Sequence, residues 1–238
     1  MMTSQEIRES RDHAPAIGLV VLDMAGTTVR DDGLVEQAFS AAAEALGVEP
    51  GGEEHARMLE HVRATMGESK ITVFRALFGA EDRARKANAV FEESYASLVD
   101  GGRISPVPGA REAIEGWRAE GRKVALTTGF ARVTQDAILD ALGWRELADL
   151  TLCPADAGRG RPYPDMVLTA LLRTGTDDVR AVAVAGDTAY DMLSGVRSGA
   201  AIVAGVLTGA HGRAALTGAG ATHVLDSVAA LPAIVGRA

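Results

Sequence analysis

Six short segments of the chain are apolar at nearly every position, a pattern typical of parallel strands that are covered on both faces. They are residues 17–22, 124–127, 150–152, 181–185, 201–206 and, with a weaker pattern, 222–225. Several intervening stretches, such as residues 110–120 and 131–142, carry apolar residues at three- and four-residue spacing, which indicates amphipathic helices. Strands that alternate with helices predict an α/β fold whose core is a doubly wound, Rossmann-like parallel sheet.

One long region interrupts this alternation, because no convincing strand pattern occurs between residues 31 and 102. Helical patterns occupy residues 35–46, 53–64, 70–78 and 81–99, and glycines separate them. We therefore predict an inserted all-helical cap domain, residues 31–102, on a core that comprises residues 17–30 and 103–238. Open α/β sheets bind ligands at the carboxyl ends of their strands, so the cap is expected to cover the site as a lid. The acidic stretch of residues 81–93 is interpreted as a solvated helix face.

Composition and charge narrow the class of protein. The chain has 24 Lys and Arg against 32 Asp and Glu, a formal net charge of -8, which argues against a nucleic-acid-binding protein. No apolar run reaches the roughly 18 residues of a membrane span. Residues 1–16 are interpreted as a polar N-terminal tail without the apolar region of a signal peptide, and the protein as cytoplasmic. The single cysteine, Cys153, permits no intramolecular disulfide and is expected to be a small buried residue.

Polar residues follow several of the predicted strands. Asp23 begins the stretch Asp-Met-Ala-Gly-Thr-Thr directly after the first strand. Asp187 and Asp191 follow the strand at residues 181–185, Thr128 follows another strand, and Arg161 lies in the rigid loop Gly-Arg-Pro-Tyr-Pro. Two carboxylates four residues apart at a strand end can converge on one hard divalent cation, which prefers oxygen ligands.

Together these residues suit phosphoryl chemistry. A divalent ion between Asp23 and the phosphoryl oxygens of a substrate offsets their repulsion, while Thr128 and Arg161 neutralise the remaining oxygens. The Asp23 carboxylate is predicted to form an aspartyl-phosphate, which water then hydrolyses. We expect Mg²⁺ to be bound by Asp23, the backbone carbonyl of Ala25 and Asp187, with Asp191 in support. The substrate is expected to be a small phosphonate or phosphate.

The order of these motifs resembles that of the haloacid dehalogenase superfamily, from about residue 17 to the C-terminus. The motifs are Asp-x-x-Gly-Thr, the Thr before Gly129, Arg161, and Gly-Asp-x-x-x-Asp. Most phosphatases of that superfamily carry a second aspartate two residues after the nucleophile, as the acid for an alcohol leaving group, but this chain has Ala25 there. The stretch that begins at Asp23 instead resembles the phosphonatase branch, the phosphonoacetaldehyde hydrolases.

A second resemblance to that branch lies in the cap. Residues 66–71 are similar to its Met-Gly-x-x-Lys-Ile motif, and Arg-Ala-Leu follows at residues 75–77. On this match Lys70 has the position of the lysine that forms a Schiff base with the substrate aldehyde. A protonated imine is an electron sink for breaking a carbon–phosphorus bond, and no acid is then needed at Ala25. Lys70 must be neutral to attack, so its pKa is expected to be lowered.

Residues around the expected substrate can also be predicted. Substrate contacts are expected from Thr27, Met66, Gly67, Thr128, Gly129, Phe130 and Arg161. Met66 is interpreted mainly as packing the seam between cap and core. The resemblance also suggests a homodimer through the caps.

The chain departs from the phosphonatase pattern at three polar positions. It has Val73 where the family has His, Phe130 where the family has Tyr, and Leu34 nearest to the family's Cys. In the family these side chains are thought to assist proton transfer and to shape the pocket, so the departures indicate a phosphonatase-like sister group. Two other functions stay open: a phosphatase of small phosphomonoesters, in which Lys70 grips phosphate, and a catalytically silent binding protein. The pair at residues 31–32, both Asp, is interpreted as a solvated hinge turn.

Overall fold

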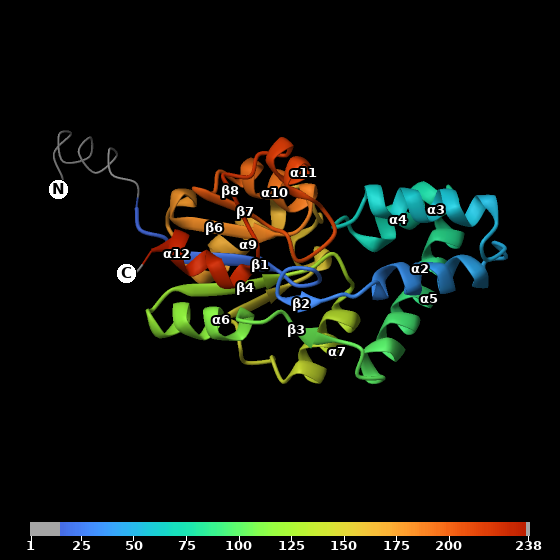
Figure 1. The fold of residues 1–238 in the computed structure, drawn as a ribbon, viewed down its shortest axis with the longest axis horizontal. Helices are drawn as coiled ribbons and strands as arrows, with labels where there is room; N and C mark the ends of the chain where they lie inside the picture. Colours follow the sequence, from blue (N-terminus) through green and yellow to red (C-terminus); the bar gives the residue numbers. More distant parts are fainter. Residues whose placement is uncertain (1–14, 237–238) are drawn as a thin grey trace.

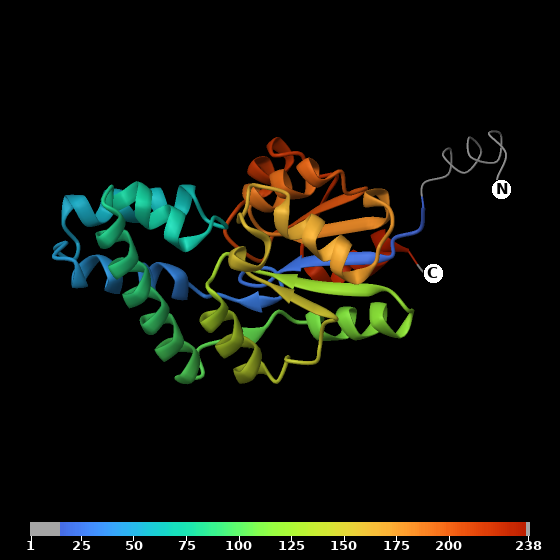
Figure 2. The same ribbon diagram turned by 180° about the vertical axis from the view of Figure 1, so that it is seen from behind.

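A computed structural model describes residues 15–236, so most of the expected tail at residues 1–16 lies outside the described residues. Figure 1 and Figure 2 show an α/β body with a group of helices beside it, at the end of the sheet where β1, Leu19–Asp23, terminates. None of the helices within residues 15–236 has both the length and the apolar character needed to span a membrane.

The body is built on a six-stranded sheet with the strand order β5-β4-β1-β6-β7-β8, in which every paired neighbour is parallel. The strands are β1 Leu19–Asp23, β4 Lys123–Thr127, β5 Leu150–Leu152, β6 Val182–Gly186, β7 Ile202–Val206 and β8 His223–Leu225. Each of the six predicted segments forms one of these strands, which confirms the predicted fold class. This order places β1 between β4 and β6. The three strands whose carboxyl ends carry Asp23, Thr128 and Asp187 are therefore adjacent.

Helices cover both faces of the sheet. They are α6 Ala110–Ala119, α7 Arg132–Leu142, α8 Pro154–Ala157, α9 Asp165–Thr174, α10 Ala189–Ser198, α11 Arg213–Gly218 and α12 Leu231–Val235, with 3-10 turns η1 Val179–Ala181 and η2 Val228–Ala230. Along β1, Val20 and Leu22 pack in one apolar cluster with α6, α7 and α12, whereas Leu19 and Val21 pack in another with α9. Successive residues of a strand face opposite sides, so a double-sided core requires the continuous apolar run seen in the sequence.

The cap helices are α2 Leu34–Ala45, α3 Glu53–Ala64, α4 Lys70–Phe78 and α5 Glu81–Asp100. The chain leaves the body through β2, Val29–Arg30, and returns through β3, Ser105–Pro106, which pair in an antiparallel ribbon. Sequence periodicity missed this ribbon because two-residue strands are too short to show alternation. The ribbon holds the two connections of the cap side by side (Figure 1).

Cap and body share one continuous apolar cluster. Phe130, from the loop after β4, stacks on Phe91 of α5 with ring centroids 6.1 Å apart, and Tyr95 of α5 lies 4.6 Å from the same ring. Aromatic pairs at these separations contribute about 0.5–1.5 kcal/mol beyond their burial. The loop that carries a predicted site residue is therefore anchored by the cap.

Candidate active site

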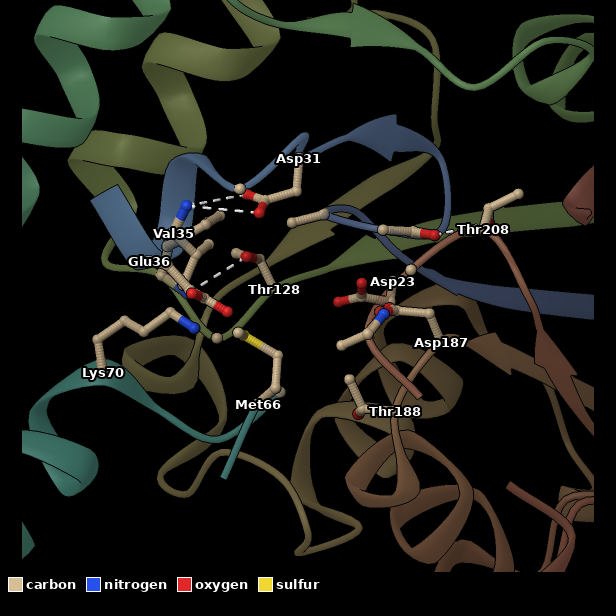
Figure 3. A pocket seen from close by; sticks show the side chains of 18 of the residues that line it. Asp23, Asp31, Val35, Glu36, Met66, Lys70, Thr128, Asp187, Thr188 and Thr208 are labelled. Atoms are coloured by element: carbon tan, nitrogen blue, oxygen red, sulfur yellow. Dashed lines mark hydrogen bonds between the residues drawn. The ribbon is translucent and has the colours of Figure 1, made fainter. Parts of the chain in front are cut away.

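A cavity of about 320 Å³ lies between the carboxyl ends of β1, β4 and β6 and the cap, within the usual range for small-molecule sites. Figure 3 shows Asp23 and Asp187 on the core side of this cavity, with Lys70 and Met66 across from them. The predicted site residues that line it are Asp23, Ala25, Met66, Gly67, Lys70, Thr128, Gly129, Phe130, Arg161 and Asp187. The structure therefore brings together residues that are up to 164 positions apart between Asp23 and Asp187.

Three buried carboxylates meet at the core end of the cavity. Asp23 ends β1, Asp187 follows β6, and Asp191 lies in the first turn of α10; each offers an oxygen within 4.8 Å of the others. Arg161 is inserted among them. Its Nη1 lies 2.6 Å from Asp23 Oδ1, its Nε lies 2.7 Å from Asp191 Oδ1, and its Nη2 donates to Thr127 Oγ1 at 2.7 Å. The Arg161 guanidinium thus forms ion pairs with both Asp23 and Asp191.

Burial shifts the pKa values of the charged groups in this cluster. It raises the pKa of Asp23 well above its usual range; Arg161 opposes that rise, and the other two carboxylates reinforce it. Burial and the charge of Asp191 also raise the pKa of Asp187 to about 6. Burial disfavours the charged form of Arg161, but Asp191 and Asp23 raise its pKa overall. When all three carboxylates are ionised, the single guanidinium balances only part of their negative charge, and a divalent cation would compensate the rest.

The geometry around Asp187 fits a magnesium ligand. Thr27 Oγ1 donates to Asp187 Oδ1 at 3.1 Å, and the backbone N–H of Ala210 donates to Oδ2 at 2.7 Å, so the carboxylate is held in one orientation. The chain approaches so closely here that a Cβ on Gly209 would lie 2.0 Å from Asp187 Oδ2. Mg²⁺ prefers oxygen ligands and is usually held by one or two carboxylates together with waters and substrate oxygens. The residues present therefore fit the expected ion: Asp23, Asp187 and Asp191 would hold it, and the backbone carbonyl of Ala25, which lines the same cavity, stays a predicted ligand.

Two predicted site residues lie behind the cavity wall instead of lining it. Thr27 is fully buried, and its hydroxyl is bonded to Asp187, so it orients this carboxylate; its contact with substrate stays a prediction. Asp191 Oδ2 accepts from the backbone N–H of Thr188 at 3.1 Å and from the Thr188 hydroxyl, which completes the capping box of α10.

Lys70 lies at the first position of α4 and is 6% exposed. Its Nζ is 5.2 Å from the ring centroid of Phe130 and 5.9 Å from that of Phe39. Within residues 15–236, no hydrogen-bond or ion-pair partner is found for this amine. Burial lowers the pKa of Lys70, while Asp31, Asp23 and Glu92 act in the opposite direction. The direction of this shift agrees with the neutral amine that the sequence analysis requires.

The loop before α4 sits directly on the core. Gly67 has a positive φ of 93°, and a Cβ there would lie 2.3 Å from Thr188 Oγ1, so a side chain would push the loop away. The backbone N–H of Lys70 donates to the carbonyl of Gly129 at 3.3 Å. These contacts fix the start of α4 against the loop after β4 and place Lys70 opposite Asp23 (Figure 3).

Comparison with known proteins identifies the family. The family model described as haloacid dehalogenase-like hydrolase matches residues 17–199, which include the cap and most of the core. The chain belongs to the haloacid dehalogenase-like hydrolases. It is therefore an enzyme, a hydrolase.

One relative and two solved structures show which members of this family the hydrolase is similar to. It is 30% identical over 199 residues to a phosphonoacetaldehyde hydrolase of Bacillus cereus strain B4264, covering 77% of this chain and 73% of the relative. Its fold matches a phosphonoacetaldehyde hydrolase-like protein from Oleispira antarctica, with a TM-score of 0.80, 23% identity, and coverage of 93% and 92%. It also matches a predicted phosphoglycolate phosphatase from Haemophilus somnus, with a TM-score of 0.77, 17% identity, and coverage of 92% and 98%. The fold alone therefore does not select the substrate.

The structure also corrects two interpretations from the sequence analysis, in which Asp31 and Glu92 were expected to face solvent. Asp31 does not belong to a solvated turn: it lines the cavity, and its Oδ1 accepts from the backbone N–H of Val35 at 3.2 Å and from the hydroxyl of Tyr95 at 3.4 Å. Glu92, in the supposed solvated face of α5, is only 8% exposed and accepts from the Thr134 hydroxyl. The position of Asp31 shortly before a helix could have indicated that its side chain bonds to the start of that helix. No sequence pattern could have indicated that Glu92 is hydrogen-bonded to a residue of α7.

Proposed function

We propose that this hydrolase cleaves the carbon–phosphorus bond of phosphonoacetaldehyde or a close analogue, with Asp23 as nucleophile and Lys70 as the imine-forming amine. The observation that carries the proposal is the placement of a buried Lys70 amine and the Asp23 carboxylate on opposite sides of one cavity (Figure 3). Ala25 lines the same cavity and has no group that could protonate an alcohol leaving group. The names of the curated relatives support the same substrate class.

The proposed reaction uses these residues in sequence. Neutral Lys70 Nζ attacks the aldehyde carbon, and loss of water leaves a protonated imine. Asp23 attacks phosphorus, and the electron pair of the breaking carbon–phosphorus bond moves toward the iminium nitrogen, giving an enamine and an aspartyl-phosphate. Water hydrolyses the aspartyl-phosphate to inorganic phosphate, and protonation and hydrolysis of the enamine release acetaldehyde. Arg161, fixed between two carboxylates, keeps Asp23 aligned with phosphorus.

Removal of magnesium is expected to abolish turnover. When bound, Mg²⁺ supplies positive charge between Asp23 and the anionic phosphonate oxygens, whose repulsion otherwise opposes attack. Dialysis against excess chelator should reduce the release of inorganic phosphate to background, and added Mg²⁺ should restore it. Ca²⁺ at the same concentration serves as a matched control, because it takes oxygen ligands in larger and less regular shells. Full turnover in excess chelator would contradict the metal assignment.

The wild-type enzyme tests the proposal directly. Incubation with phosphonoacetaldehyde should release acetaldehyde and inorganic phosphate in equal amounts. Borohydride added during turnover should reduce the imine and attach the substrate carbons to Lys70, which peptide mapping by mass spectrometry locates. Absence of both products and of any adduct would reject the proposal. Release of phosphate from small phosphomonoesters in the same assay would then favour the phosphatase reading.

A further inference from the structure

The carboxylate of Asp31 faces the cap end of the active-site cavity. It lies in the turn between β2 and α2, and both of its oxygens accept from the backbone N–H of Val35, at 3.2 Å and 3.4 Å. A capping role explains these two bonds. It does not explain the second donor, the Tyr95 hydroxyl of α5, which comes from another helix and donates to Oδ1 at 3.4 Å. Tyr95 is fully buried, so its hydroxyl has been brought to this carboxylate by tertiary packing.

The Lys70 amine lies beside the rings of Phe130 and Phe39, and the carboxylates of Asp31, Asp23 and Glu92 act on its pKa. Val73 and Phe130 occupy the positions at which the resembling family carries His and Tyr, Leu34 lies nearest to the position of its Cys, and all three are buried. The hydroxyl that is absent at Phe130 is present on the ring that packs against it, since Tyr95 lies 4.6 Å away between centroids. Among the carboxylates that act on Lys70, Asp31 has the largest effect on its pKa.

We propose that Asp31, hydrogen-bonded to Tyr95, carries protons between the Lys70 amine and the carbonyl oxygen of the substrate during imine formation. This inference rests on the proposed function, because it concerns the imine step alone. The Lys70 ammonium gives one proton to Asp31, and the neutral amine attacks the aldehyde. Asp31 then protonates the departing oxygen, accepts a second proton from nitrogen and passes it on. Two of the three ammonium protons leave in water, and the third stays on the iminium.

The electrostatic setting supports this transfer. Burial raises the pKa of Asp31, although the charge of Lys70 opposes the rise, and burial lowers the pKa of Lys70. The two values therefore approach each other, which lowers the cost of moving a proton between them, either directly or through one water molecule. Burial and the charge of Asp31 raise the pKa of Tyr95 well above its usual range, so its hydroxyl keeps its proton and remains a donor to the carboxylate.

The test compares Asp31→Asn with Asp100→Asn. Asparagine at residue 31 keeps an oxygen for the Val35 N–H but cannot carry a proton. Asp100 is an exposed aspartate at the end of α5 and is not among the residues that line the cavity, so its replacement is the matched control. In single turnovers with phosphonoacetaldehyde, borohydride trapping at Lys70 should be about 10²-fold slower for Asp31→Asn and within threefold of wild type for Asp100→Asn. The loss should appear in kcat, with KM within threefold.

Tyr95→Phe provides a second variant, because it leaves the bond between Asp31 and Val35 intact and keeps the packed ring. We expect about tenfold slower trapping, since Asp31 loses only its hydrogen-bond partner. Melting temperatures identify a variant that has lost its fold, in which case the other variant decides. Trapping by Asp31→Asn at a rate within threefold of wild type would overturn the proton-carrier role and leave the proposed function intact. Failure of the wild type to be trapped at all would instead reject the proposed function.

Discussion

Asp23→Asn is expected to reduce kcat by about 10⁴-fold or more, because it deletes the oxygen that forms the bond to phosphorus. The fold should survive, since asparagine has the same size and burial already disfavours the charged form of Asp23. Acid-quenched wild-type enzyme should carry a phosphoryl group on the peptide that contains Asp23. The variant should carry none, which intact-mass and peptide mass spectrometry can measure.

The loss must be separated from weaker metal binding, because Asp23 is also an expected Mg²⁺ ligand. Titration calorimetry with Mg²⁺ gives the affinity of each protein, and turnover is then measured at saturating Mg²⁺. Asp100→Asn, at the exposed end of α5, is the matched control and should keep normal turnover. Near-normal activity of Asp23→Asn with saturating metal would show that another residue attacks phosphorus.

Lys70→Arg is expected to abolish turnover of phosphonoacetaldehyde and trapping by borohydride. Arginine keeps the positive charge but stays protonated, so it cannot attack a carbonyl carbon. A lysine that only grips substrate phosphate should tolerate the change with a modest loss. Lys86→Arg, on the exposed face of α5, serves as the control for the substitution itself. Retention of most activity by Lys70→Arg, together with no trapping in the wild type, would reject carbon–phosphorus cleavage.

The acid side of the pH profile offers an independent measurement of the same step. Imine formation needs neutral Lys70, and burial lowers the pKa of this amine, so the neutral fraction at neutral pH exceeds that of an exposed lysine. As pH falls below that lowered pKa, the ammonium form accumulates and the rate of trapping should decline. A gripping lysine is fully charged under those conditions, so phosphate release should not decline until other groups, such as Asp187, titrate.

Local pattern was sufficient to predict the sheet and the arrangement of the principal motifs. Each of the six strands coincides with a predicted apolar run, because a strand that is covered on both faces needs apolar side chains at successive positions. The cap helices at Glu53–Ala64 and Lys70–Phe78 have the predicted bounds, since glycines end the patterns on either side. Asp23 and Asp187 could be placed together in advance because parallel strands present their carboxyl ends at one edge.

Only the tertiary structure determined which of the neighbouring polar residues reach the cavity. Thr27 belongs to the first motif, yet its hydroxyl turns toward Asp187, a direction set by a partner 160 residues away. Asp31 was interpreted as part of a solvated hinge turn, but the packing of α5 against α2 brings Tyr95 to its carboxylate. Sequence periodicity reports which face of an element is buried. The identity of the group that a buried side chain meets depends on contacts between elements that are distant in the chain, and those exist only after folding.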